Sequence, residues 1–213
     1  MTTANKITLI RICMIPFFIW FALQNDATSL IIALVLFCVA SFTDFLDGYI
    51  ARKYNQVTDF GKFVDPLADK LLVTAALLIF IEKGIFPAWM VFIVLAREFI
   101  ITSLRNVAAA KGRVLAATWT GKVKTCVQIA GIIVDFLYLI VLGMSISSGG
   151  SEVASSIGVI GGADGPTSVV VMSSGVSLPT IVAWVVTLVT LYAGIDYLRK
   201  NWDLIKDGAV KQK

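Results

Sequence analysis

Residues 44–69 read DFLDGYIARKYNQVTDFGKFVDPLAD and place four aspartates in an otherwise apolar chain: Asp44, Asp47, Asp65 and Asp69. The first two are three residues apart and the last two are four apart, so on helices each pair would share one face. Carboxylates near a bilayer are costly unless they are paired or bind metal. Two helices that present these pairs to each other would form an all-oxygen site, which Mg²⁺ and Mn²⁺ prefer.

The composition of the whole chain is that of a membrane protein. Of its 213 residues, 58% are hydrophobic and only 15% are charged. A hydrocarbon core about 30 Å thick requires ~20 apolar residues per helix. Six runs approach or exceed this length: 7–24, 28–51, 63–82, 86–105, 122–146 and 178–198. We therefore predict an all-α integral membrane protein, with six transmembrane helices in one bundle that forms a single domain over residues 1–213.

The positions of the basic residues predict the orientation of this bundle. If the N-terminus lies in the cytoplasm, all of the 18 Lys and Arg residues except Lys83 fall at the cytoplasmic side. Such a bias follows the positive-inside rule and puts both termini and the four aspartates at the cytoplasmic surface. The net charge of +4 suits anionic lipids and phosphorylated substrates. No nucleic-acid recognition motif is present, so we expect no nucleic-acid partner.

The first apolar run is predicted to be a retained helix. It lacks a small-residue cleavage site and contains Arg11 and Pro16, which argues against a signal peptide. We expect a bacterial protein of the cytoplasmic (inner) membrane, since no transit peptide is evident. The sequence contains no histidine, which removes histidine bases and Ser-His or Cys-His nucleophiles from consideration.

The spacing of residues 44–69 resembles the signature of the CDP-alcohol phosphatidyltransferase family, D-x2-D-G-x2-A-R-x8-G-x3-D-x3-D. A solvated acidic loop would explain the carboxylates but not the fixed glycines and arginine. All eight fixed positions of the signature are matched: Asp44, Asp47, Gly48, Ala51, Arg52, Gly61, Asp65 and Asp69.

The resemblance implies a role for each matched residue. Asp44, Asp47, Asp65 and Asp69 would bind Mg²⁺ or Mn²⁺, with two ions expected, and Asp69 would also be the general base. The residues implied in binding CDP-diacylglycerol are Asn5, Thr8, Gly48, Ala51, Arg52 and Gly61. The spacing alone does not separate the base from the metal ligands. We also expect membrane lipids as partners and a homodimer.

Three other segments resemble the branch of this family that uses glycerol 3-phosphate as the acceptor. They are the N-x-I-T-x2-R opening at residues 5–11, the R-E-F-x2-T-x2-R segment at 97–105 and the G-K-x-K-T-x2-Q segment at 121–128. The cations implied in binding glycerol 3-phosphate are Arg97, Arg105, Lys122 and Lys124. Ordinary positive-inside flanking is the alternative for any one of them. Arg97 and Glu98 lie within an apolar run, where charges usually pair or line a cavity.

The sequence therefore predicts transfer of a phosphatidyl group from CDP-diacylglycerol to glycerol 3-phosphate, with release of CMP. Another acceptor alcohol, such as inositol phosphate, serine or phosphatidylglycerol, is the alternative within the family.

Two features do not follow the family pattern. Residues 145–177 form an atypical insertion, expected on the outer side, and residues 161–167 read GGADGPT, similar to a sodium-binding motif of decarboxylase membrane subunits. We interpret the insertion as a loop without a catalytic role. Asp135, in the fifth run, is expected to pair within the bundle. A sodium-coupled transporter, supported only by Asp135, Asp164 and these glycines, is a weaker alternative because no internal repeat is evident.

Overall fold

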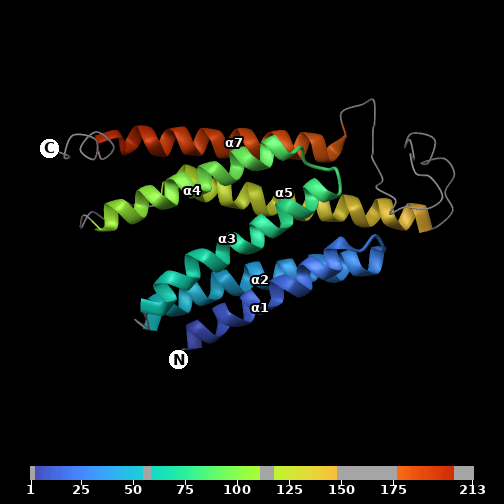
Figure 1. Ribbon diagram of the computed structural model, residues 1–213, viewed down its shortest axis with the longest axis horizontal. Helices are drawn as coiled ribbons and strands as arrows, with labels where there is room; N and C mark the ends of the chain where they lie inside the picture. The colour runs from blue at the N-terminus through green and yellow to red at the C-terminus, as the bar shows by residue number, and fades with distance from the viewer. Residues whose placement is uncertain (1–2, 55–58, 111–117, 148–176, 204–213) are drawn as a thin grey trace. The chain divides into compact units, whose positions relative to one another are not determined.

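The computed structural model describes residues 3–54, 59–110, 118–147 and 177–203. Within these ranges it describes the side chains except those of residues 3–7, 44–67, 69, 110 and 145–147. The described part contains six α-helices and no strand. They are α1 (Thr3–Leu23), α2 (Ala27–Tyr54), α3 (Asp59–Glu82), α4 (Ala88–Ala110), α5 (Trp119–Ser147) and α7 (Leu178–Lys200) (Figure 1). Each overlaps one of the six predicted apolar runs, so the all-helical prediction is confirmed for this part of the chain.

The chain divides into two units, and α5 contributes to both. The first unit contains α1, α2, α3 and the part of α5 from Ile132 onward. The second unit contains α4, the part of α5 up to Gly131, and α7. Two helices, over Trp119–Met144 and Leu178–Lys200, are long and apolar enough by themselves to cross a membrane. Shorter apolar helices cover Thr8–Leu23 and Ala27–Thr43 among the described residues.

Four phenylalanines form the centre of the first unit, where α1 packs on both α2 and α3. Phe18 of α1 lies 5.9 Å from Phe37 of α2 and 5.8 Å from Phe136 of α5, measured between ring centroids. Phe80 of α3 lies 5.1 Å from the Phe136 ring. All four are buried, and tilted or edge-on aromatic pairs each contribute about 0.5–1.5 kcal/mol beyond the area they bury.

Two polar connections hold the ends of these helices together. The Asp26 carboxylate accepts a hydrogen bond of 2.8 Å from the backbone N–H of Ser29 and so caps the first turn of α2. Lys83, which follows α3, donates to the backbone oxygen of Gln24 at 3.0 Å and to the side chain of Asn25 at 2.9 Å. Lys83 therefore ties the turn after α3 to the connection between α1 and α2.

In the second unit, α7 packs closely on α4 and on the first part of α5. A Cβ atom at Gly131 would lie 2.9 Å from a methyl group of Val186, so only glycine fits there without a shift. Trp89 of α4 and Trp184 of α7 form an edge-on pair with ring centroids 5.7 Å apart. The side chains of all five tryptophans are substantially exposed, as are many large aliphatic side chains of α7. Surfaces this apolar are typical of proteins that face lipid.

Candidate active site

The aspartates of the signature lie on two helices that contact each other. Asp44 and Asp47 belong to α2, Asp65 and Asp69 belong to α3, and these two helices pack within the first unit. The helical spacing that the sequence predicted is thus present in the backbone. The side chains lie outside those the structure describes, so the metal site stays a prediction. Five implied ligands of CDP-diacylglycerol also lie outside the residues whose side chains are described, so their role stays a prediction: Asn5, Gly48, Ala51, Arg52 and Gly61.

The start of α3 differs from the prediction. From the apolar run 63–82 and the tolerance of proline in a first helical turn, the sequence predicts a start a few residues before Pro66, with Asp65 and Asp69 in the first two turns. The helix instead begins at Asp59, so Asp65 is its seventh residue and Asp69 its eleventh. The apolar run marks where membrane-like composition begins, whereas a helix can begin earlier at an acidic residue that favours its positive N-terminal end. Pro66 therefore lies inside α3, where it cannot donate the backbone hydrogen bond of a regular turn.

Thr8 is the one implied ligand of CDP-diacylglycerol whose side chain is described. It lies on α1 and is buried, as is Arg11 about one turn further along the same helix. Both belong to the opening segment that resembles the family branch with glycerol 3-phosphate as acceptor. A buried threonine and a buried arginine in an apolar helix mark a polar region in the interior of the first unit.

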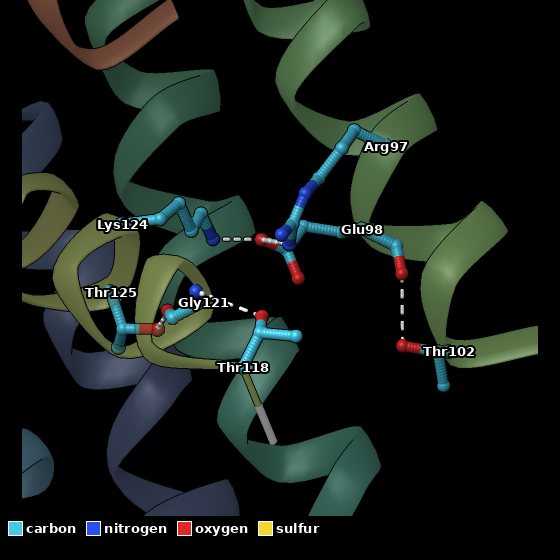
Figure 2. Close-up of polar contacts among 7 residues, drawn as sticks. All are labelled: Arg97, Glu98, Thr102, Thr118, Gly121, Lys124 and Thr125. Atoms are coloured by element: carbon cyan, nitrogen blue, oxygen red, sulfur yellow. Dashed lines mark hydrogen bonds and ion pairs between the residues drawn. The ribbon is translucent and has the colours of Figure 1, made fainter. Parts of the chain in front are cut away.

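The second unit contains a cluster of charged side chains centred on Glu98 (Figure 2). The Glu98 carboxylate accepts hydrogen bonds from Nζ of Lys124 and, at 3.4 Å, from Nη1 of Arg97. The backbone oxygen of Glu98 accepts a hydrogen bond of 2.9 Å from Thr102. Lys124 is 5% exposed, and buried cations of this kind need a counter-charge. The structure thus brings together Arg97 and Lys124, two of the four predicted phosphate ligands.

Arg105, the third predicted ligand, is held by α7. Its Nε donates a hydrogen bond of 3.1 Å to the hydroxyl of Tyr197, and its guanidinium carbon lies 5.2 Å from the centroid of the Tyr197 ring. Lys122, the fourth, is exposed on α5 and makes no contact with the Glu98 cluster in the part of the chain that is described. Two residues along a helix rotate the side chain by about 200°, which separates Lys122 from Lys124.

Several residues of this region were not assigned a role from the sequence. Asp196 accepts hydrogen bonds from Thr120 at 2.7 Å and from Lys200 at 3.0 Å. Tyr197 binds Arg105, and Glu98 is the counter-charge of Lys124. The sequence contained only a weak indication of these contacts. Glu98, beside Arg97 in an apolar run, is expected to pair, but the sequence does not identify Lys124 as its partner.

Two buried donors near this cluster have no hydrogen-bond partner among the described residues. They are Nε of Arg97 and Nε2 of Gln128. Gln128 follows Lys124 by four residues on α5, so the two side chains share a face. A buried donor without an acceptor costs roughly 1–3 kcal/mol. Oxygen atoms of an anionic ligand are acceptors for donors of this kind.

Asp135 and the insertion do not join this cluster. Asp135 is fully buried, and neither of its carboxylate oxygens has a hydrogen-bond partner among the described residues. The pairing predicted for Asp135 is therefore not found in that part of the chain. Asp164 and the glycines around it lie outside the described residues, as does most of the predicted insertion.

Comparison with known proteins identifies the family. The model of the CDP-alcohol phosphatidyltransferase family matches residues 1–161, and the chain belongs to this family. It is similar to the CDP-diacylglycerol–glycerol-3-phosphate 3-phosphatidyltransferase of Bacillus subtilis strain 168, with 40% identity over 95% of this chain and 96% of the relative.

Two further relatives match over a shorter length. The enzyme of the same name from Escherichia coli K12 is 40% identical over 59% of this chain and 71% of its own length. A probable phosphatidylglycerophosphate synthase of Mycobacterium tuberculosis H37Rv is 39% identical over 61% of this chain and 63% of its own length.

Proposed function

We propose that this chain transfers the phosphatidyl group of CDP-diacylglycerol to the primary hydroxyl of glycerol 3-phosphate, giving phosphatidylglycerol phosphate and CMP. The complete aspartate signature on α2 and α3 supports the reaction class. The observation that supports the choice of acceptor is the cluster of Arg97 and Lys124 around Glu98, because it suits a phosphate monoester, which serine and phosphatidylglycerol lack. Inositol phosphate also carries a phosphate monoester, so the cluster alone does not separate it from glycerol 3-phosphate. The names of the three relatives agree with this acceptor.

The four aspartates supply the donor set for a divalent metal. Asp44 and Asp47 of α2 and Asp65 and Asp69 of α3 would hold one or two Mg²⁺ or Mn²⁺ ions through carboxylate oxygens. When bound, such ions neutralise the phosphoryl charge and stabilise the departing phosphate. Gly48, Arg52 and Gly61 would accommodate the cytidine diphosphate group, with Asn5, Thr8 and Ala51 beside it.

The reaction needs one proton transfer and one exchange of bonds at phosphorus. Asp69 accepts the proton of the acceptor hydroxyl as that oxygen forms its bond to the phosphorus that carries the diacylglycerol. The bond from this phosphorus to the oxygen of CMP breaks, and CMP leaves with the bonding electrons. Arg97, Arg105 and Lys124 hold the phosphate of the acceptor, with Lys122 available from the surface.

We further propose a cytoplasmic-membrane protein with six spans, cytoplasmic termini and a cytoplasmic site. The support is the charge bias, in which only Lys83 of the 18 basic residues falls at the outer side. Exposed tryptophans near the ends of helices, such as Trp20, Trp89 and Trp119, are consistent with interfacial anchoring. The homodimer stays a prediction.

Steady-state kinetics of Arg105→Gln, with both substrates varied, test the choice of acceptor. Loss of a charge-assisted contact costs roughly 1.5–3 kcal/mol, which corresponds to about a ten- to hundredfold lower kcat/KM for glycerol 3-phosphate. The KM for CDP-diacylglycerol should change less. The matched control is Arg199→Gln, which removes the same charge from an exposed position on α7. Equal weakening toward both substrates, or better use of inositol phosphate, serine or phosphatidylglycerol by the unmodified protein, would contradict the proposal.

A further inference from the structure

Arg105 is oriented by one buried residue of α7. Tyr197 is 1% exposed, and its hydroxyl accepts the hydrogen bond from Nε of Arg105. The edge of the guanidinium that carries Nε is thereby occupied. The guanidinium carbon also lies 5.2 Å from the ring centroid of Tyr197, within the range of a cation–π contact. Arg105 itself is exposed, and its two terminal nitrogens have no hydrogen bond or ion pair among the described residues.

This arrangement leaves the guanidinium free to bind a ligand through the nitrogens that form its fork. An arginine has five N–H donors, of which Nε carries one and the two terminal nitrogens carry the rest. A planar fork matches two oxygens of a phosphate. A flexible arginine would lose conformational entropy when it binds, and prior attachment to Tyr197 reduces that loss.

The same face of α7 also fits Arg97. Gly194 precedes Tyr197 by three residues, and so the two share a face of α7. A Cβ atom at position 194 would lie 2.9 Å from Cγ of Arg97 and 3.6 Å from its Nε. A side chain there would displace the stem of Arg97, which is not a freely moving end. Two residues of α7 therefore determine where two arginines of α4 lie.

We propose that the Gly194–Tyr197 face of α7 is a positioning element for recognition of the acceptor's phosphate monoester. Tyr197 fixes the fork of Arg105, and Gly194 leaves the space in which Arg97 lies against α7. Neither residue needs to touch the reacting atoms. The inference rests on the proposed function, because it concerns the phosphate of the same acceptor.

The first test is Tyr197→Phe, which keeps the ring and removes the hydroxyl that holds Nε. The KM for glycerol 3-phosphate should rise about five- to twentyfold, less than for Arg105→Gln, because the cation remains and only its orientation is lost. The kcat and the KM for CDP-diacylglycerol should stay within about twofold of their original values, a separation that general damage to the fold would not produce. The matched control is Tyr192→Phe on the same helix, because Tyr192 is 68% exposed.

A double-mutant cycle separates positioning from a direct contact with substrate. In an Arg105→Gln background, Tyr197→Phe should have no further effect on the KM for glycerol 3-phosphate, because the group that it positions is gone. Independent effects of the two changes, or a Tyr197→Phe variant that behaves like Tyr192→Phe, would overturn the inference and leave the proposed function intact. Failure of the unmodified protein to use glycerol 3-phosphate would instead overturn the proposed function.

A second pair of variants tests the glycine. Gly194→Ala should raise the KM for glycerol 3-phosphate because its Cβ displaces Arg97. Gly143→Ala on α5 is the control, since its Cβ would have ordinary contacts, the nearest being a backbone oxygen at 3.6 Å. Melting temperatures of both variants show whether they fold. If Gly194→Ala folds and its KM for glycerol 3-phosphate is unchanged, Gly194 has no role in positioning Arg97.

Discussion

Glu98 places a negative charge between two cations of the second unit. Lys124 and Arg97 both donate to its carboxylate, and the Lys124 side chain is 6% exposed. A buried ion pair contributes little net stability relative to apolar residues, but removal of one partner leaves an uncompensated charge. We interpret Glu98 as the residue that keeps the two cations in place before an anionic ligand arrives.

Glu98→Gln should therefore destabilise the protein. We expect a loss of about 1–3 kcal/mol in the free energy of unfolding, visible as a lower melting temperature in detergent. Lys200→Gln is the control, because the Lys200–Asp196 pair is 3.0 Å long but Lys200 is 59% exposed, and exposed pairs contribute about 1 kcal/mol or less. Equal melting temperatures for the two variants would show that the Glu98 ion pairs contribute no more to stability than the exposed Lys200–Asp196 pair.

Asp26 links the stability of α2 to pH. The N–H of Ser29 that donates to its carboxylate holds the pKa of Asp26 below its ordinary value. The charged form is therefore favoured in the folded state, and its contribution is complete above the unfolded pKa of about 3.9 and lost as the pH falls through the lower folded value.

Asp26→Ala should lower the melting temperature at pH 7, and the gap to the unmodified protein should narrow as the pH falls below about 4. Asp26→Ser, which can still cap the helix, should retain most of the stability at pH 7. A gap that is constant from pH 7 to about 3 would mean that the carboxylate is not the capping group.

At the scale of the elements, the end of α3 shows how a glycine sets a helix boundary. The N–H of Ile85 donates to the oxygen of Phe80, and the N–H of Gly84 donates to that of Ile81, which together form a Schellman motif. Gly84 has φ of 68°, in the left-handed region. A Cβ there would meet nothing within 4 Å, so the requirement for glycine is purely conformational.

Gly84→Ala should destabilise the protein by about 1–2 kcal/mol, the cost of a left-handed conformation in a residue with a Cβ atom. Gly84→Asn should lose less, because asparagine tolerates this conformation better. Thermal unfolding of both in one detergent provides the comparison. Gly84→Ala that melts at or above the temperature of the unmodified protein would contradict the argument.

The elements were more predictable than their contacts. Apolar composition alone predicted one run for every described helix, because a membrane span must be long and apolar. The start of α3 was missed because polar residues before the run also adopt helix. The contact between Arg105 and Tyr197 joins residues 92 positions apart, and no periodic pattern encodes such a pairing. The signature predicted that the four aspartates lie in pairs on two helices, whereas the contacts of Glu98, Tyr197 and Gly194 are seen only in the structure.

At the scale of the whole molecule, the proposed topology separates the chemistry from the insertion. The aspartates and the basic cluster would lie at the cytoplasmic side, and residues 145–177 at the outer side. Replacement of residues 147–176 by a short Gly/Ser connection should therefore leave phosphatidyl transfer largely intact. Sodium should not stimulate turnover. A folded deletion variant without activity, or a sodium effect lost in Asp164→Asn, would require a role for the insertion.

The central claim is tested most directly by following both products of one reaction. Purified protein is given CDP-diacylglycerol and isotopically labelled glycerol 3-phosphate, and CMP and labelled lipid are quantified together. We predict one CMP for each labelled phosphatidylglycerol phosphate, no product when a chelator removes divalent metal, and none from Asp47→Asn, which removes a charge with little change in volume. CMP release without labelled lipid, or full turnover by folded Asp47→Asn, would contradict the account.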